Sequence, residues 1–484
     1  MNIHFSNNIV ILGCGSIAQC ALPMLLKHLP VKPQQISVID FVDNRDRVST
    51  ALEQGVSYHL HKITPDNLAS TLSQHAKMGD IIIDLAWNID CVEIVDWCHQ
   101  HGVMYINTSV EEWDPYTDHH LRHPTTRTLY HRHMQLRKHM QNWQSNHSPT
   151  AILEHGANPG LVSHFIKIAL RDISTALLST GKTDISKPLL ERALADADFA
   201  KLAYLTGTKV IHISERDTQI VNQPKKQNEF VNTWSAEGLY EEGIAPAEMG
   251  WGTHEKRLPQ NAFSHQIGPR NQICLGQMGI HTKVRSWVPS GEIIGMVIRH
   301  GEAFTISEYL SLADNEEIYY RPTVHYAYCP SDMAIASLYE LAMHNYKKPL
   351  HERIVSDEVI DGQDELGVLL MGHGLDSWWT GSILDIHTAR QLVPGQNATT
   401  VQVAAAVLSA VQWMMKNPEA GVKVPDDLPY EEILHYAKPF LGKIVSKHSS
   451  WTPTKHRRQL FANYGDKVLN RDDPWQFENF LISD

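Results

Sequence analysis

Carboxylates and tryptophans are concentrated between residues 215 and 255. This stretch holds eight acidic residues and three basic ones, together with Trp234 and Trp251. Carboxylates make charge-assisted hydrogen bonds to ammonium groups, and an indole face attracts a cation by about 0.5–2 kcal/mol. The composition therefore favours a pocket for an organic cation. The alternative is that both tryptophans are core residues and the acids lie on a solvated face.

Two further segments place polar side chains in constrained settings. Residues 155–160 (HGANPG) set Asn158 between glycines and a proline, which aims one short amide, although a plain turn has the same composition. Glu215 and Asp217 follow an apolar run at residues 209–213, so they share one face if that strand continues.

A glycine-rich turn near the start predicts dinucleotide binding. Apolar residues 9–12 precede the sequence GCGSIA, a helical stretch at 19–28 and a second apolar run that ends in Asp40. In such a unit Gly13 allows the tight turn, Gly15 leaves room for a pyrophosphate, and the helix start offers free N–H groups. Asp40 would accept hydrogen bonds from a ribose diol and repel a 2′-phosphate, so NAD is favoured over NADP. A glycine turn without a ligand is the alternative.

The elements around these residues predict an α/β chain with a Rossmann-type, parallel, doubly wound sheet and a second α+β catalytic domain. Runs at 55–60, 80–86 and 103–106 alternate with helical stretches, whereas runs at 209–213, 283–288, 292–300 and 367–371 alternate with polar turns. Ligands bind beyond the carboxyl ends of parallel strands, so Trp87, Asn88, Thr108 and Glu111 are expected near the cofactor. The predicted cofactor-binding residues are Gly13, Gly15, Ser16, Ile17, Asp40, Trp87 and Thr108.

The domain organisation follows from the same change of pattern. We predict an NAD-binding domain at residues 1–150 and a substrate, catalytic and dimerisation domain at 151–395. A mainly helical segment at 396–484 is expected to pack back on the first domain. Residues 401–415 are too short and too polar an apolar stretch to span a bilayer, and they predict a buried helix.

Composition limits the partners and the compartment. The 484 residues carry a net charge of −12, which disfavours nucleic acids and anionic membranes. Six scattered cysteines and a start without a basic-then-apolar leader predict a reducing, cytoplasmic compartment. Residues 114–148 are rich in histidine but lack the ligand spacing of a metal site, so we expect a solvated helix between two domains and no metal.

Ten motifs, in one order along nearly the whole chain, resemble those of the bacterial homospermidine synthases, NAD-dependent enzymes related to the saccharopine dehydrogenase group. One departure is Asn88, where the family can have Asp, so a charged contact there is in question. The motifs are GCGSIAQ, SVEEW, GANPGLVS, ERDTQ, VNTWSAEG, AEMGWGTHE, VRSWVP, YRPTVHYAY, DGQDELGVLLMGHG and PGQNATTVQV.

The resemblance implies a homodimer that keeps NAD bound while it joins two putrescines, or spermidine and putrescine, into sym-homospermidine with release of ammonia or diaminopropane. It places Asn158, Glu215, Trp234 and His300 around the reacting amine, where Glu215, helped by Asn158 or His300, is a reasonable base. It places Glu111, Glu237, Glu242 and Asp364 in the outer parts of the substrate channel.

Two other functions are weighed against this one. A saccharopine- or carboxyspermidine-type dehydrogenase would use free NAD(P)H and need an arginine clamp for a carboxylate, whereas the stretch around Trp234 is acidic. A non-catalytic NAD-binding sensor is the third alternative.

Overall fold

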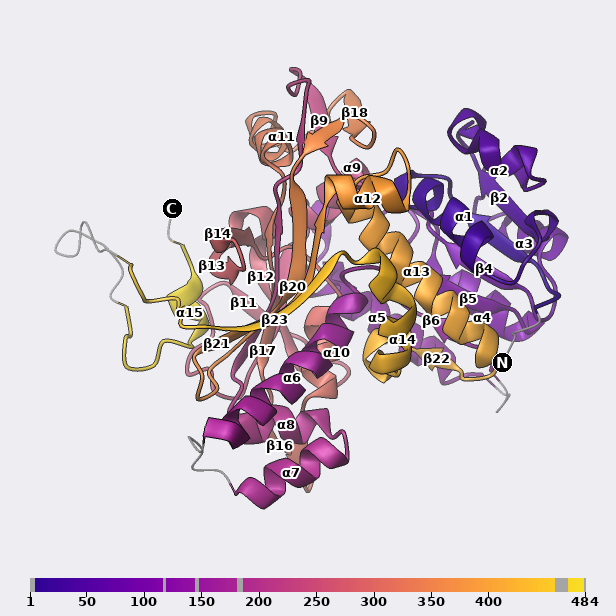
Figure 1. Ribbon diagram of the computed structural model, residues 1–484. Helices are drawn as coiled ribbons and strands as arrows, with labels where there is room; N and C mark the ends of the chain where they lie inside the picture. The colour runs from indigo at the N-terminus through magenta and orange to yellow at the C-terminus, as the bar shows by residue number, and fades with distance from the viewer. Residues whose placement is uncertain (1–4, 116–118, 144–147, 181–185, 458–468, 483–484) are drawn as a thin grey trace.

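The first part of the molecule is a parallel sheet, as predicted, on the right of Figure 1. The computed structural model describes residues 5–115, 119–143, 148–180, 186–457 and 469–482. Seven strands lie in the order β22-β6-β5-β4-β1-β2-β3, and all their pairings are parallel. They are β1 (Ile9–Leu12), β2 (Ile36–Asp40), β3 (Ser57–Leu60), β4 (Ile81–Asp84), β5 (Met104–Asn107), β6 (Ala151–Ile152) and β22 (Val422–Lys423). The order from β3 to β6 is that of a doubly wound dinucleotide-binding fold.

Helices cover both faces of this sheet, which explains why its central strands are apolar throughout. Ile9 and Ile11 pack in the same core as α1 and α13, whereas Val10 and Leu12 pack in the core of α3 and α4. Successive side chains of a strand point to opposite faces, so a strand buried on both sides has no polar alternation. The helices are α1 (Ser16–His28), α2 (Ser49–Glu53), α3 (Leu68–His75), α4 (Cys91–His101) and α13 (Ala398–Lys416).

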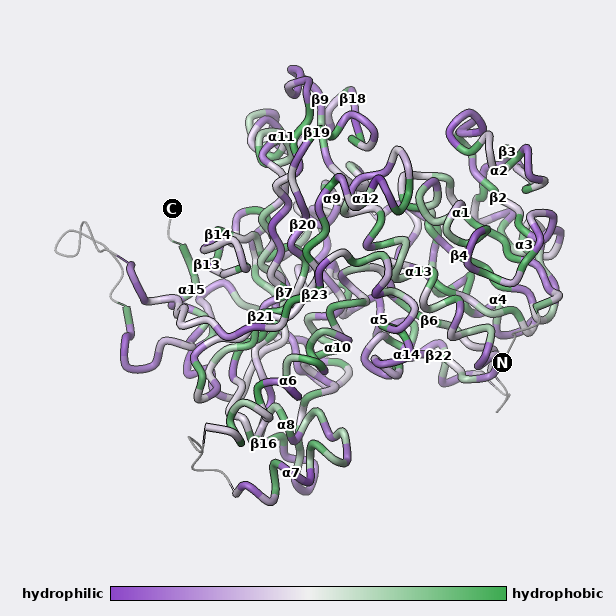
Figure 2. Tube along the Cα trace, viewed as in Figure 1, coloured by the Kyte–Doolittle hydropathy of each residue, from purple (hydrophilic) through white to green (hydrophobic). Residues whose placement is uncertain are grey.

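The second part is built on a mixed sheet of ten strands, also as predicted. Its central strand β7 pairs in parallel with β17 and antiparallel with β20, and α6 (Leu161–Thr180) packs on β20 and β21. Figure 2 shows hydrophobic residues along this interior and hydrophilic residues in the peripheral loops. The strands are β7 (Val210–Asp217), β10 (Pro246–Gly250), β11 (Ala262–Ser264), β12 (Gln272–Met278), β13 (Lys283–Val288), β14 (Gly291–Met296), β17 (Thr323–Cys329), β20 (Gln363–Met371), β21 (Ser377–Asp385) and β23 (Lys443–Ser449).

Smaller elements complete this part. Three two-stranded ladders pair β8 (Ile220–Val221) with β19 (Val359–Asp361), β9 (Glu229–Asn232) with β18 (His351–Ile354), and β15 (Leu312–Asp314) with β16 (Glu317–Tyr320). The helices are α7 (Lys187–Ala195), α8 (Phe199–Thr206), α9 (Ala236–Ile244), α10 (Glu302–Tyr309), α11 (Asp332–Met343) and α12 (Ile386–Leu392).

The C-terminal segment contributes a strand to each of the two sheets. Helix α13 packs against α1 and α14 (Tyr430–Ala437), and β22 extends the parallel sheet. The chain then returns to the mixed sheet, where β23 pairs with β21 and α15 (Phe477–Phe480) lies against β13. Helix α13 has the length and composition of a membrane span, but 89% of its most apolar window is buried inside the fold. The division of the chain at residues 150 and 395 stays a prediction.

The helix expected to be solvated is half-buried instead. Helix α5 (Leu129–Met140) buries Leu129, Tyr130 and Met134, and also Arg132 and His133. Arg132 and His133 are tolerated inside because each faces a buried carboxylate, Glu241 and Glu154 respectively. Residues 116–118 and 144–147 of this predicted segment lie outside the described residues.

Candidate active site

A cavity lies where the two sheets meet, at the carboxyl ends of the parallel strands. Ile17, at the start of α1, lines it together with Trp87 and Thr108, which follow β4 and β5. Of the predicted substrate-site residues, the cavity lining includes Asn158, Glu215, Trp234, His300, Glu111 and Glu242. The structure thus brings residues from distant parts of the chain to one space.

The glycine turn has the geometry that a dinucleotide requires. Gly13 has a φ of +84°, and a Cβ there would lie 2.9 Å from the backbone of Ala86, so only glycine fits. At Gly15, in contrast, a Cβ would meet no atom within 4 Å, so open space lies beside the first turn of α1. Helix α1, which begins at Ser16, has no side-chain cap, so its first N–H groups are available to a phosphate.

Asp40 is the last residue of β2, as predicted for the ribose-binding acid. Its Oδ2 accepts a hydrogen bond of 2.5 Å from the N–H of Cys14, and its Oδ1 accepts one of 2.8 Å from Val42. The carboxylate therefore braces the glycine turn from the place where a ribose diol would bind.

Glu215 lies near the end of β7 and is 2% exposed. Its Oε2 accepts hydrogen bonds from Asn158 Nδ2 at 2.6 Å and from the hydroxyl of Tyr326 on the neighbouring strand β17. Burial raises the pKa of this carboxyl to about 7, although both hydrogen bonds act in the opposite direction. A carboxyl with a pKa near neutrality can both take and return a proton.

The loop of residues 156–160 holds Asn158 in place. The N–H of Gly156 donates to the carbonyl of Pro159 at 2.7 Å, and Gly160 has a φ of +133°. A Cβ on Gly160 would lie 1.8 Å from the Gly156 carbonyl oxygen, so this closed loop requires glycine. The sequence therefore folds here to aim one amide at Glu215.

Trp234 faces the cavity from the loop between β9 and α9. Its indole N–H donates to the hydroxyl of Tyr328 at 2.9 Å, and a Cβ on Gly238 would lie 2.7 Å from the indole ring. The hydrogen bond and this close contact fix the ring plane. A fixed indole face beside Glu215 can stabilise a cation that forms during a reaction.

His300 is held between two carboxylates. Its Nε2 lies 3.0 Å from Glu242 Oε2, and its Nδ1 lies 3.1 Å from Glu302 Oε1. Burial alone would lower the pKa of His300, but the negative charges of Glu302 and Glu242 outweigh it and hold the pKa well above its usual range. The two carboxylates therefore favour the charged imidazolium form of His300.

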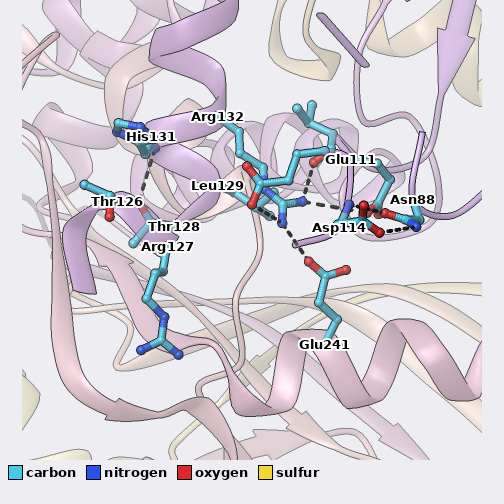
Figure 3. Close-up of polar contacts among 12 residues, drawn as sticks. Asn88, Glu111, Asp114, Thr126, Arg127, Thr128, Leu129, His131, Arg132 and Glu241 are labelled. Carbon is cyan, nitrogen blue, oxygen red and sulfur yellow. Dashed lines mark hydrogen bonds and ion pairs between the residues drawn. The ribbon is translucent and has the colours of Figure 1, made fainter. Parts of the chain in front are cut away.

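A buried ion-pair network forms one wall of the cavity (Figure 3). Arg132 reaches Glu241 at 2.7 Å and Glu111 at 3.7 Å, and Arg299 reaches the same oxygen of Glu241 at 2.5 Å. Although burial opposes its charge, the two arginines lower the pKa of Glu241 to about 2. For Glu111, burial and the charge of Glu241 raise the pKa to about 8. Because Arg132 belongs to α5 and Arg299 follows β14, the network joins the two parts of the molecule.

Asn88 pairs with a neighbouring acid. Its Oδ1 accepts from the N–H of Asp114 at 2.5 Å, and its Nδ2 lies 3.4 Å from the Asp114 carboxylate (Figure 3). An aspartate at position 88 would face Asp114 with like charge, so the amide suits this site. Neither Asn88 nor Asp114 is in the cavity lining.

Two predicted substrate-channel residues are not in the cavity lining, and their roles stay predictions. Asp364 is fully buried, opposite Asp217 in the β20–β7 ladder. Its Oδ2 accepts from Thr399 at 2.6 Å, and its Oδ1 has no hydrogen-bond partner among the described residues. Burial and the neighbouring charges of Glu215 and Asp217 raise its pKa well above the usual range. Glu237 lies outside the cavity lining and pairs with Lys348.

Only part of the acidic stretch at 215–255 serves the cavity. Trp251 packs in the mixed-sheet core against Phe477, so the core alternative holds for that tryptophan. Glu248 accepts hydrogen bonds from the N–H groups of Leu129 and Tyr130 at the start of α5. This carboxylate therefore caps a helix and is not available to a ligand.

Sequence reasoning missed the residues that hold the site residues in place. Tyr326, Tyr328 and Glu241 lie in the motifs YRPTVHYAY and VNTWSAEG or directly after them, but no local spacing pairs Tyr326 with Glu215, 111 residues away. Alternation along β17 is the available signal, since Tyr326 and Tyr328 project from the same face.

Comparisons with known proteins match both parts of the chain. Residues 9–152 match the saccharopine dehydrogenase NADP binding domain, and residues 156–449 match the saccharopine dehydrogenase C-terminal domain. The chain is 36% identical over 483 residues to the homospermidine synthase of Mesorhizobium japonicum. This match covers 98% of this chain and 96% of that protein. The chain is also 37% identical over 485 residues to the homospermidine synthase of Blastochloris viridis. That match covers 98% of this chain and 97% of the other protein.

A solved structure is similar along the whole chain. The crystal structure of the homospermidine synthase from Legionella pneumophila, in complex with NAD, is 39% identical and has a TM-score of 0.87. The match covers 99% of both chains.

Proposed function

This chain belongs to the homospermidine synthases of the saccharopine dehydrogenase family, and from that premise we propose that it joins two putrescines into homospermidine with release of ammonia. Spermidine is the proposed second aminobutyl donor, with release of diaminopropane. The observation that carries this proposal is the position of Glu215, a buried carboxyl with a pKa of about 7, beside Trp234 in a cavity that reaches the start of α1.

The proposed cofactor is NAD, and the residues present fit it. The open space at Gly15 and the uncapped start of α1 suit a pyrophosphate, and the Asp40 carboxylate favours NAD because it would repel the 2′-phosphate of NADP. When bound, NAD would take up a hydride from the carbon that carries the reacting amine and return it after the two amines have exchanged.

Glu215 is the proposed base. An alkyl ammonium with a pKa of about 10.4 must lose a proton before its carbon can be oxidised. Ionised Glu215 accepts that proton, and Asn158 and Tyr326 hold the carboxylate in position through its Oε2, which leaves Oε1 for the substrate.

Trp234 and the surrounding carboxylates are proposed to stabilise the substrate cations. The face of Trp234 is the proposed neighbour of the carbon that becomes an iminium, and Glu242, which is paired with His300, lines the same cavity. Glu111, with a pKa of about 8, is the proposed uncharged hydrogen-bond partner near neutral pH. Burial keeps water from the reactive imine, which would otherwise be hydrolysed. The second amine then adds, ammonia leaves, and the reaction is redox-neutral overall.

A dehydrogenase that handles an amino acid is less well supported. Such an enzyme needs an arginine for the substrate carboxylate, whereas Arg132 and Arg299 are both paired with Glu241.

We also propose that the protein works in the cytoplasm as a homodimer, without nucleic acid or membrane partners. The free thiols of all six cysteines support a reducing compartment. The exposed apolar side chains of Tyr339 and Met343 on α11, with Ile220 across a groove of about 680 Å³, support a subunit interface there. Sedimentation of the protein and of Met343→Asp tests this; a monomeric wild-type protein contradicts it.

The decisive experiment incubates the purified protein with NAD and putrescine deuterated at the carbons that carry nitrogen, and analyses the products by mass spectrometry. We expect homospermidine, one ammonia per product, and retention of the transferred deuterium when unlabelled NADH is in excess. Absence of homospermidine and ammonia would contradict the proposal. Accumulation of NADH in proportion to product would favour the dehydrogenase.

A further inference from the structure

Lys348 lies near Trp87, a residue of the cavity lining, in the loop that joins α11 to β18. Its ammonium is hydrogen-bonded to Glu237 and lies 3.1 Å from Glu352 Oε1. It also lies 5.9 Å from the centroid of the indole ring of Trp87, which lines the cavity. Two carboxylates and one aromatic face thus surround a primary ammonium next to the cavity lining.

This arrangement has the chemistry of a polyamine site. The side chain of lysine is an n-butylammonium group, which is the same group as the aminobutyl arm of a polyamine. Carboxylates and an indole face within about 6 Å are the partners that such an ammonium seeks. The side chain of Glu237 is 13% exposed, whereas that of Lys348 is 45% exposed, so the carboxylate is built into the fold and the lysine lies over it.

The loop that carries Lys348 is held independently of this ion pair. The hydroxyl of Tyr240 on α9 donates to the carbonyl of Tyr346 at 3.0 Å, and the hydroxyl of Tyr346 lies 2.7 Å from His281 Nε2. Figure 1 shows α9 and β18 close together at this end of the molecule, where the two elements contact each other. Removal of the Lys348 ammonium should therefore leave the loop in place and the two carboxylates open to another cation.

We propose that Lys348 is a specificity-determining residue, whose ammonium fills an outer ammonium site made by Glu237, Glu352 and Trp87. This inference rests on the proposed function, because the competitor is the terminal ammonium of a polyamine substrate. A substrate long enough to extend from the cavity past Trp87, such as spermidine, must displace Lys348 to use the site. Putrescine, which is shorter, has no such competition, so the lysine favours it over longer polyamines.

The test compares Lys348→Met, which keeps the apolar stem, with Lys348→Arg, which keeps the charge. Lys347→Met, one residue away and exposed, is the matched control. Binding of spermidine and putrescine to the NAD-loaded protein is measured by titration calorimetry, and KM is measured for both. Because an exposed ion pair is worth up to about 1 kcal/mol, we expect Lys348→Met to tighten spermidine binding by about 5-fold. The affinity for putrescine should be unchanged. Lys348→Arg and Lys347→Met should keep the wild-type ratio of spermidine affinity to putrescine affinity.

Three outcomes would overturn the inference: an unchanged ratio of spermidine affinity to putrescine affinity in Lys348→Met, an equal change in the affinity for both amines, or the same gain in spermidine affinity in Lys348→Arg. In Lys348→Met/Glu237→Gln the gain should disappear, because the carboxylate that receives spermidine is gone, and persistence of the gain also counts against the site. Calorimetry does not depend on turnover. If the wild-type protein makes no homospermidine, the proposed function fails while the binding ratio still tests Lys348; if it makes product and the ratio is unchanged, this inference alone fails.

Discussion

Replacement of Glu215 by glutamine should separate the chemical role of this carboxyl from its effect on stability. Both hydrogen bonds that it accepts, from Asn158 and from Tyr326, end on the same oxygen, Oε2. An amide oxygen in that position can accept the same two bonds, so the fold should be retained. The variant loses the base, and a general base contributes about 10²–10⁴-fold to rate.

The stability effect follows from the pKa of the buried group. A pKa of about 7 in the folded protein, against an ordinary value of 4.5, means that ionisation of buried Glu215 costs about 3 kcal/mol. Because the folded-state pKa is the higher one, the protein is most stable below pH 4.5, where Glu215 is protonated in both the folded and the unfolded state. This stability is lost as the pH rises through 7. Glu215→Gln should therefore be more stable than the wild-type protein by about 3 kcal/mol above pH 8, and by less than about 1 kcal/mol near pH 5.

Urea unfolding at these two pH values, with homospermidine production measured by mass spectrometry, tests both parts. Glu255→Gln is the matched control: burial raises the pKa of Glu255 to about 7 as well, but this residue contacts Thr323 and Phe477 and lies outside the cavity. It should show a similar pH-dependent gain and keep its turnover. Turnover of Glu215→Gln close to that of the wild-type protein would refute the assignment of the base, and a stability difference independent of pH would refute the burial argument.

Three further predictions follow from the described contacts. Gly15→Val should abolish bound NAD, measured by absorbance after denaturation. The melting temperature of the NAD-free protein should not change, because a side chain there enters open space; retained NAD contradicts the cofactor site. Trp234→Phe should keep part of the turnover and Trp234→Glu should lose it, and full turnover in Trp234→Ala would exclude the cation–π role. Arg132→Met should reduce the free energy of unfolding by less than the about 3–5 kcal/mol that an unpaired buried charge costs, because Glu241 keeps its ion pair with Arg299. Arg132→Met/Arg299→Met, which leaves the Glu241 carboxylate unpaired, should reduce it further, and an unchanged urea midpoint in the single variant contradicts the buried ion pair.

The parallel sheet could be predicted from the sequence because burial on both faces leaves a short apolar run. The runs at 9–12 and 36–39 became β1 and β2, and 283–288 became β13 without any shift. Strand β23 could not be predicted, because its residues (KIVSKHS) are largely polar and its place depends on β21, more than fifty residues earlier. Strand formation there is decided by the partner and not by the local pattern.

The candidate site shows the same limit. Asn158 and Glu215 stand out in the sequence because glycines or a strand end surround them. The ion pairs of Glu241 cannot be recognised in the sequence, because Arg132 and Arg299 lie 109 and 58 residues away and only the folded chain brings them together. The buried face of α5 was misjudged for this reason, because a buried arginine and a solvated one have the same sequence pattern.

The shared core of α1 and α13 has a consequence for how the protein is made. Ile9 and Ile11 on β1 share one apolar cluster with Val401 and Ala404 on α13, and β22 closes the edge of the same sheet. The nucleotide-binding half therefore cannot finish folding when its first 150 residues leave the ribosome, because an apolar face stays open until nearly the whole chain has been translated. We therefore expect the cofactor site to be completed late in biosynthesis, after the catalytic residues have been synthesised.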